Sequence, residues 1–214
     1  MLLRNTLCTL ACAMALATPP ALAGETVKVA PAGTYKTDPA HSTLQWSFDH
    51  FGLSRYFARF SGVEAKLEWN PSEPETSTLE VTIDPMSVRT DYPWPEIEDF
   101  DAKLATAPQF FAGQPISFVS KSIRITGEKT GKVDGMLTMR GQTKPAILDV
   151  SFNGSLAHHP LEKTAKLGFS ASATILRSQW GFDFAIPVLG DEVRIDVETQ
   201  MVPASFALGN PHGT

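Results

Sequence analysis

The chain has 214 residues, and its 18 Lys and Arg against 23 Asp and Glu give a formal net charge of −5. Nucleic acids and anionic lipid surfaces are bound through clustered positive charge, so this balance argues against both as partners. No apolar stretch in the sequence reaches the length of a membrane-spanning helix, and we expect no transmembrane segment.

Residues 1–23 have the features of a cleavable secretory signal peptide. Arg4 is the only charged residue in this segment, an uncharged apolar stretch covers residues 7–17, and small residues at 21 and 23 precede Gly24. The stretch is too short to cross a bilayer. We therefore expect a mature N-terminus near Gly24 and a periplasmic location. Both cysteines, Cys8 and Cys12, would be removed with the signal peptide, which excludes a disulfide in the mature protein.

The remaining length suits one domain with a full core. We expect an N-terminal leader over 24–33, one β domain over 34–203 and a C-terminal tail over 204–214. From residue 42 onward, apolar and polar side chains alternate, as they do in a pleated strand with one buried face. The alternating apolar sets are Leu44, Trp46, Phe48 and His50; Val63, Ala65, Leu67 and Trp69; Leu79, Val81 and Ile83; Val133, Gly135, Leu137 and Met139; Ala146, Leu148, Val150 and Phe152; Ala165, Leu167, Phe169, Ala171, Ala173 and Ile175; and Val193, Ile195 and Val197.

Short turn signals separate these segments, which favours antiparallel hairpins. They lie at 52–54, 70–74, 127–131, 140–143 and Asn153-Gly154, and Gly190-Asp191 opens the final strand.

The alternation stops between residues 91 and 113. Ile97, Phe100 and Leu104 recur there at helical spacing, with charged residues on the other faces, and we expect one short amphipathic helix over 96–104. Its apolar stripe needs a buried partner. Two positions fit the pattern equally well: the helix covers the open end of a barrel, or it packs against the outside of a sheet.

About eight strands and one helix, with no repeat and no linker, favour an all-β fold in which a closed antiparallel barrel leaves no unpaired edge. Small residues fall in phase with the large apolar ones. They either leave room for a ligand or only fit the taper of a filled barrel. These small positions are Ala65, Gly135, Ala146, Ala165, Ala171 and Ala173.

No motif of nucleophilic catalysis, dinucleotide binding or zinc hydrolysis occurs in the sequence, so we expect no catalytic residue, no metal site and no cofactor. His50 lies in phase with Trp46 and Phe48. We expect it to be a buried, hydrogen-bonded side chain rather than a metal ligand.

Seven short motifs, in this order, resemble those of the YceI-like family of polyisoprenoid-binding proteins. The resemblance covers residues 35 to 202 and implies an extended lipocalin-like antiparallel barrel in the periplasm that binds a long isoprenoid chain, with a quinone or prenyl phosphate head. The motifs are 35–42 (YKTDPAHS), 50–54 (HFGLS), 83–90 (IDPMSVRT), 115–118 (PISF), 135–145 (GMLTMRGQTKP), 177–181 (RSQWG) and 190–193 (GDEV).

The chain departs from the family pattern at two places. Residues 100–104 read FDAKL where many relatives have Arg-Asp-x-His-Leu, and Ala58 stands where a glycine is usual after the first hairpin. Both departures bear on the contacts to a ligand head group.

The function we expect is that of a non-catalytic carrier of an isoprenoid lipid held in the barrel; a homodimer is possible. The alternative is a filled structural barrel that acts as an envelope stress component or as a partner of redox enzymes. Arg55 or Arg59 would meet the head group. The expected tail contacts are Leu44, Trp46, Phe48, Ile83, Phe100, Leu104, Phe118, Leu137, Phe169, Ala171, Trp180 and Phe182.

Overall fold

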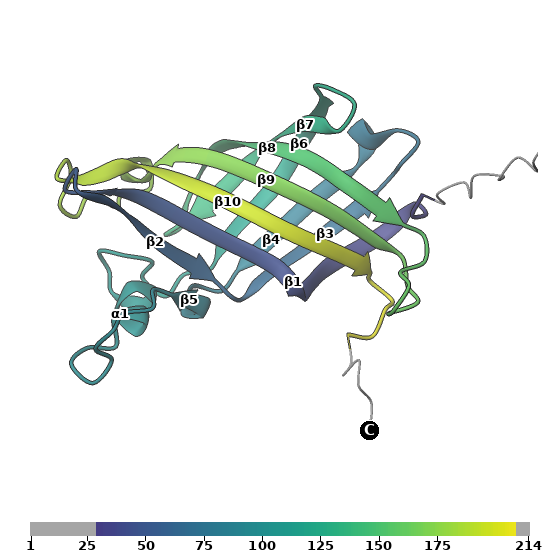
Figure 1. Ribbon diagram of the computed structural model, residues 1–214. Coiled ribbons are helices and arrows are strands. Elements are labelled where there is room, and N and C mark those ends of the chain that lie inside the picture. Colours follow the sequence, from purple (N-terminus) through teal and green to yellow (C-terminus); the bar gives the residue numbers. More distant parts are fainter. Residues whose placement is uncertain (1–28, 209–214) are drawn as a thin grey trace, which may run out of the picture.

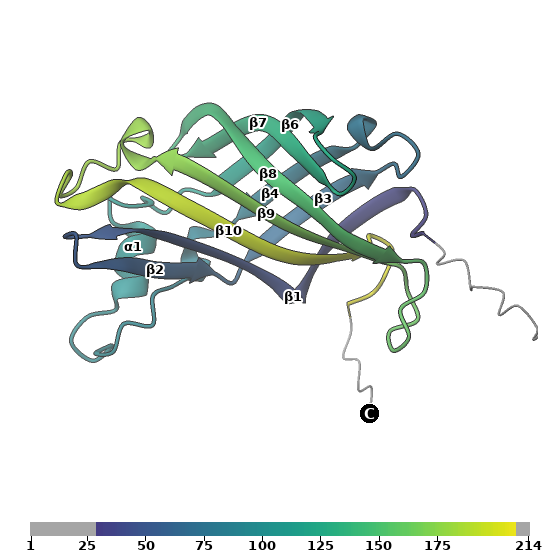
Figure 2. The same cartoon turned by 45° about the horizontal axis from the view of Figure 1, so that its top comes forward.

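The computed structural model describes residues 29–208, which form a ten-stranded antiparallel sheet and one α-helix (Figures 1 and 2). The predicted signal peptide and most of the predicted leader lie outside the described residues. Within 29–208 no helix has the length and apolar character to cross a membrane. The strands are β1 (Gly33–His50), β2 (Ser54–Phe60), β3 (Val63–Trp69), β4 (Thr78–Ile83), β5 (Val88–Arg89), β6 (Ile116–Ile125), β7 (Thr130–Met139), β8 (Gln142–Leu156), β9 (Lys166–Leu176) and β10 (Leu189–Pro203); the helix is α1 (Phe100–Thr106), and the 3-10 helices are η1 (Pro74–Thr76), η2 (Pro85–Ser87) and η3 (Arg177–Trp180).

Eight of these strands close into a barrel. The order β10-β9-β8-β7-β6-β4-β3-β1 is completed by a direct pairing of β1 with β10, and every pair is antiparallel. The far half of β1 pairs with β2, which carries β5 and extends one wall beyond the closed part. This confirms an all-β, extended antiparallel barrel of about eight strands with a single helix.

A bulge in β1 changes which residues face the interior. Thr37 pairs with Met201 and Ser42 with Thr199, so β1 advances five positions (42 − 37) while β10 advances two (201 − 199). The three extra residues are an odd number, and they reverse the phase of the strand. Odd-numbered Thr37 before the bulge and even-numbered Leu44 after it therefore both line the barrel interior.

Most of the predicted turns are hairpin turns in the structure. Arg140 and Gly141 have φ of 48° and 70°, the left-handed pair typical of a two-residue hairpin, and Phe51 and Gly52, with φ of 61° and 68°, lie in the three-residue connection between the paired His50 and Ser54. The turn predicted at Asn153-Gly154 is wrong. The strand β8 continues through it to pair with β9, and Gly154, with φ of 150°, accommodates a bulge between Phe152 and Gly154 instead.

Two apolar cores lie at different heights in the barrel. The first surrounds Trp180, Phe182 and Leu104 near α1, and the second surrounds Tyr35 and Leu167. The second core also contains Ala30, which is 1% exposed and whose N–H donates to Ser155 Oγ at 3.2 Å. The end of the predicted leader thus packs against the barrel.

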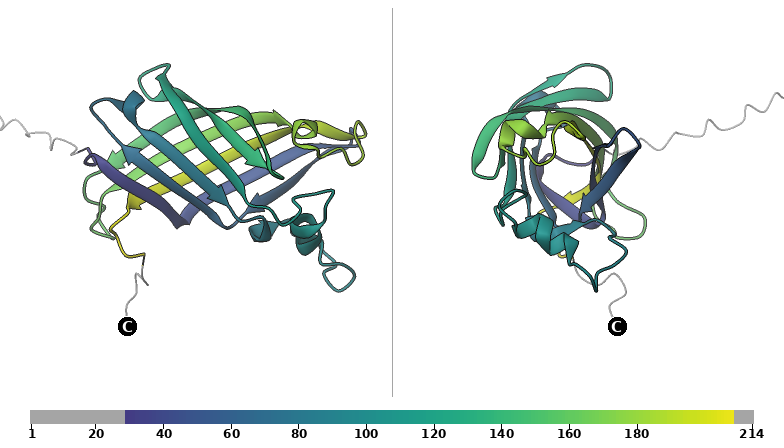
Figure 3. Two further views of the ribbon diagram at one scale, coloured as in Figure 1. Left: turned by 180° about the vertical axis from the view of Figure 1, so that it is seen from behind. Right: turned by 90° about the vertical axis from the view of Figure 1, so that its left-hand side faces the viewer.

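The helix starts later than its apolar spacing predicts. Asp99 caps it, its Oδ1 accepting from the N–H of Ala102 at 2.9 Å, so α1 begins at Phe100. Ile97 precedes the helix and is 73% exposed, which makes it wrong as a member of the buried stripe. The buried face is formed by Leu104 and Ala105, and α1 lies at the rim of the barrel beside η2 and β5 (Figure 3).

Candidate functional site

The barrel encloses a cavity of about 290 Å³. All eight barrel strands contribute to its wall, whereas β2, β5 and α1 contribute nothing. The wall is mostly aliphatic and aromatic, because each strand directs alternate side chains inward. The apolar wall residues are Leu44, Val63, Ala65, Leu67, Trp69, Leu79, Val81, Ile83, Phe118, Ile123, Ile125, Val133, Leu137, Ala146, Leu148, Val150, Phe152, Phe169, Ala171, Ala173, Ile175, Ile195, Val197 and Met201.

Four alanines stand among the larger side chains of the wall. Ala65, Ala146, Ala171 and Ala173 line the cavity. Gly135 does not leave room in the same way: a Cβ there would lie 2.3 Å from Phe118 Cζ, so the Phe118 ring already fills the position. Small inward-facing residues therefore serve two purposes in this barrel, ligand space and ring packing.

The cavity reaches the surface at the β6–β7 turn. Glu128, Lys129 and Thr130 of this turn line it and are exposed, and Ile125 beside them is 48% exposed. The opposite end is closed by Trp180, which is fully buried and donates from Nε1 to the carbonyl of the wall residue Leu137 at 3.2 Å. The site is thus an apolar cavity with one open end.

Half of the twelve residues expected to contact the tail line this cavity. The other six lie outside its wall: Trp46 stacks on Phe48 at 6.0 Å between ring centroids on the half of β1 that pairs with β2, Phe100 and Leu104 belong to α1, and Trp180 and Phe182 lie at the end of η3 and just after it. The two-residue period of a strand predicts which face a residue occupies, but not its depth along the barrel. The six that line the cavity are Leu44, Ile83, Phe118, Leu137, Phe169 and Ala171.

Neither arginine expected at the head group lines the cavity. The Arg55 guanidinium donates to Ser47 Oγ at 3.0 Å, and Arg59 pairs with Asp91 at 2.6 Å on the exposed side of the sheet. The cationic side chain at the cavity mouth is instead that of Lys129. Its only signal in the sequence is its place in a turn between two barrel strands.

His50 is not the buried, hydrogen-bonded histidine that its phase predicts. It is half-buried at the end of β1, its ring packs on Phe51 and Tyr56 with centroids 4.8 and 6.1 Å away, and no hydrogen bond to the ring occurs in the described part of the chain. The expectation is wrong because β1 ends there, at the exposed hairpin.

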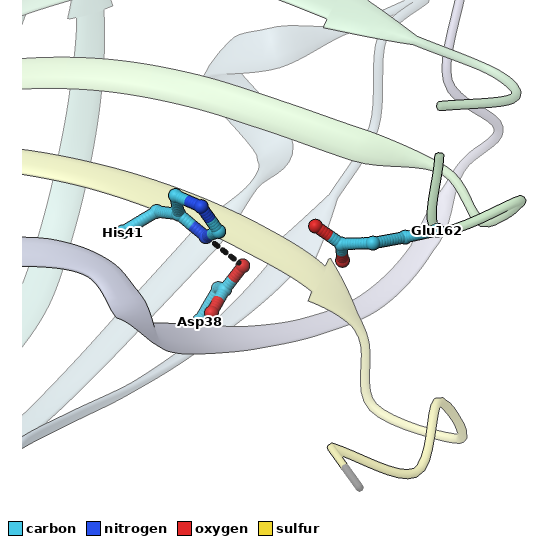
Figure 4. Close-up of side chains that lie close together, drawn as sticks. All are labelled: Asp38, His41 and Glu162. Atoms are coloured by element: carbon cyan, nitrogen blue, oxygen red, sulfur yellow. Dashed lines mark hydrogen bonds and ion pairs between the residues drawn. The ribbon is translucent and has the colours of Figure 1, made fainter. Parts of the chain in front are cut away.

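Asp38, His41 and Glu162 come together outside the cavity (Figure 4). Lys166 Nζ lies among them, 2.8 Å from Asp38 Oδ2 and 2.5 Å from Glu162 Oε1, and it supplies the positive charge that the carboxylates require. Burial favours the neutral acid, but the hydrogen bonds from Lys166 and His41 outweigh it and hold the pKa of Asp38 below its ordinary value. This group is a buried ion-pair cluster that holds the β1 bulge.

Two of the motif arginines hold the closed end of the barrel. Arg177 donates to the carbonyls of Phe182 at 2.8 Å, Phe184 at 3.0 Å and Gly190 at 2.8 Å. Arg140 donates to the carbonyls of Gly181 and Pro108. Burial lowers the pKa of the Arg177 guanidinium. The negative charges of nearby Asp191 and Asp183 act in the opposite direction but do not outweigh burial. These motif residues therefore act on the fold, away from the cavity.

Substitution of Phe100 by alanine is expected to leave ligand binding unchanged. The Phe100 ring packs on Tyr92 at 5.4 Å and does not line the cavity. The side chain is half-buried, so we expect a smaller loss than the about 3–5 kcal/mol of a fully buried phenylalanine. Thermal melts and displacement of a labelled prenyl chain measure the two effects. Faster release of the probe would instead assign α1 to the exit path of the ligand.

Comparison with known proteins places this chain in a family. Residues 35–201 match the family model of the YceI-like domain. A UPF0312 protein of Pseudomonas putida is 30% identical over 173 residues, covering 79% of this chain and 84% of that protein. A UPF0312 protein of Staphylococcus aureus is 29% identical over 149 residues, covering 69% and 81%.

Solved structures show the same barrel. The Campylobacter jejuni YCEI protein has a TM-score of 0.62 at 25% identity, covering 72% of this chain and 88% of that one. Burkholderia cenocepacia BcnA has a TM-score of 0.63 at 19% identity, covering 77% of this chain and 98% of that one. A polyisoprenoid binding domain from Saccharophagus degradans has a TM-score of 0.54 at 13% identity, covering 79% of this chain and 98% of that one. The last two similarities are similarities of fold. From its matched residues and its relatives, the chain belongs to the YceI-like family.

Proposed function

We propose that this protein is a non-catalytic carrier that holds a long isoprenoid chain in the barrel cavity. One observation carries the proposal: an apolar cavity of about 290 Å³, closed at one end and open at the β6–β7 turn. An apolar chain can enter such a cavity lengthwise and leave its end near the mouth. The Saccharophagus domain is named for polyisoprenoid binding, but its 13% identity supports the fold only, so the proposal depends on the cavity.

The energetics of chain burial suit a carrier. Each buried methylene contributes about 0.8 kcal/mol, and micromolar affinity corresponds to about 8 kcal/mol. A few isoprene units therefore exceed this value before the cost of association is subtracted. No chemical step is needed for the ligand to be held and released.

Gentle purification followed by organic extraction and mass spectrometry tests the proposal. An isoprenoid recovered in molar proportion to the protein supports it, and saturable, stoichiometric displacement of a fluorescent prenyl probe from the stripped protein gives the affinity. A stripped protein that binds no prenyl probe would rule out the carrier function.

We further propose export to the periplasm through residues 1–23, because this segment combines Arg4, an apolar stretch and small residues before Gly24. The intact mass of protein recovered from the periplasm should correspond to a start near Gly24. A mass that retains residues 1–23 would contradict export by cleavage.

The cavity also bears on the alternative of a filled structural barrel. A filled barrel would have large side chains at its central inward positions, whereas Ala65, Ala146, Ala171 and Ala173 stand there. The geometry thus favours the carrier.

A further inference from the structure

Among the polar residues of the cavity wall, Thr37 and Ser42 of β1 and Thr199 of β10 lie on neighbouring paired strands. The hydroxyls of Ser42 and Thr199 are 2.8 Å apart. Ser42 Oγ also lies 2.8 Å from the carbonyl oxygen of Asp38, and Thr199 Oγ1 lies 3.2 Å from that of Gln200. Each of these two hydroxyl hydrogens therefore has an acceptor within the protein.

The Thr37 hydroxyl differs from its two neighbours. The β1–β3 pairing ends at Lys36 and Lys66, and Thr37 Oγ1 then accepts the N–H of Ala65 at 2.7 Å in place of a backbone carbonyl. Thr37 is 8% exposed, and among residues 29–208 its hydroxyl donates no hydrogen bond of its own. A buried donor without an acceptor is unfavourable, so this hydrogen is available to a ligand in the cavity.

We propose that the Thr37 hydroxyl donates a hydrogen bond to an uncharged acceptor oxygen, such as a carbonyl, on the bound chain. This inference rests on the proposed carrier function. It makes Thr37 a specificity-determining residue, because a hydrocarbon of the same shape would leave the donor unsatisfied.

The charges around the cavity favour a neutral oxygen over an ionised phosphate at this position. Among the described residues of the wall, Lys129 alone has a cationic side chain, and it lies at the exposed turn. The buried Lys166 is paired with Asp38 and Glu162 outside the cavity. A phosphate beside Thr37 would therefore be buried without a countercharge, which is strongly unfavourable.

The experiment compares three probes on the stripped protein: farnesylacetone, the hydrocarbon in which a methylene group replaces its carbonyl oxygen, and farnesyl phosphate. We expect Thr37→Val to weaken farnesylacetone binding about 3- to 10-fold, the effect of one net hydrogen bond, and to leave the hydrocarbon's affinity unchanged. Thr37→Ser keeps the hydroxyl and should restore ketone binding. Since Thr37→Val also removes the acceptor for Ala65, hydrocarbon binding reports whether the cavity remains intact.

Ser77→Ala is the matched control. Ser77 is 5% exposed, lines the cavity, and its Oγ accepts from the N–H of Asn70 at 3.0 Å, so it is, like Thr37, a buried wall hydroxyl that accepts a backbone N–H. Ketone binding lost in Ser77→Ala and retained in Thr37→Val would overturn the inference. An equal loss of affinity for the ketone and for the hydrocarbon in Thr37→Val would also overturn the inference, but it would leave the proposed carrier function standing. Failure of all three probes to bind would remove both proposals.

Discussion

Replacing Lys166 by methionine is expected to lower the free energy of unfolding by about 3–5 kcal/mol, the cost of leaving a buried ion without its partner. The Asp38 and Lys166 side chains are 4% and 5% exposed, with Nζ 2.8 Å from Oδ2. The substitution keeps the bulk of the stem but leaves the Asp38 carboxylate buried with only His41 and the N–H of Ala40 as partners. Urea denaturation measures the loss.

The control is Lys132→Met, which removes a lysine of the same length from an exposed pair with Asp149, 39% and 61% exposed. Exposed pairs contribute about 0–1 kcal/mol, so this variant should unfold close to the wild type. The double variant Asp38→Asn with Lys166→Met should recover part of the stability, because the buried Asp38 charge is removed and only the more exposed Glu162 carboxylate loses its partner. Equal losses in Lys166→Met and Lys132→Met would mean that the buried pair does not hold the β1 bulge.

The contribution of this pair should depend on pH at both extremes. The pKa of Asp38 is held below its ordinary 3.8, so its contribution is present above that value and is lost as pH falls through the lowered pKa. Burial lowers the pKa of Lys166, but its carboxylate partners outweigh this and raise it above 10.5, so its contribution is present below that value and is lost at higher pH. The stability difference between wild type and Lys166→Met should therefore be largest near neutral pH and shrink both as pH falls through the lowered pKa of Asp38 and as it rises through the raised pKa of Lys166.

The strands and their inward faces could be predicted from the sequence because alternation is a local signal. Leu44, Phe118 and Ala171 were expected to face inward, and they line the cavity. Their depth could not be predicted. Trp46 follows Leu44 by two residues on the same face, yet it lies beyond the cavity, because depth depends on how eight strands are staggered around the barrel.

The polar features of the barrel have no local signal. Asp38 and Lys166 are 128 residues apart in the chain, and the bulge that they hold reverses the phase of β1. Without that reversal, Thr37 and Leu44 could not both line the cavity. The helix was misplaced for a different reason: Ile97 has the spacing of the stripe, but Asp99 caps the helix after it.

Enlarging Ala171 to phenylalanine is expected to abolish isoprenoid binding with little loss of stability. Ala171 lines the cavity between its strand partners Val150 and Val197, which line it as well, so the new ring would occupy space that a ligand needs. A cavity can accept this volume, whereas a packed core loses about 1–3 kcal/mol on overpacking. We expect affinity for a labelled prenyl probe to fall by at least about 100-fold, or about 2.7 kcal/mol.

Ala165→Phe provides the contrast, because Ala165 is 7% exposed and belongs to the second core rather than to the cavity wall. This variant should melt at a lower temperature and, once folded, bind the probe normally. Comparing the stability and the probe affinity of the two variants therefore distinguishes a position that faces an open cavity from one that faces a packed core. If Ala171→Phe were as unstable as Ala165→Phe, the barrel would have no usable cavity at this height; if it bound the probe with unchanged affinity, the chain would have to lie elsewhere.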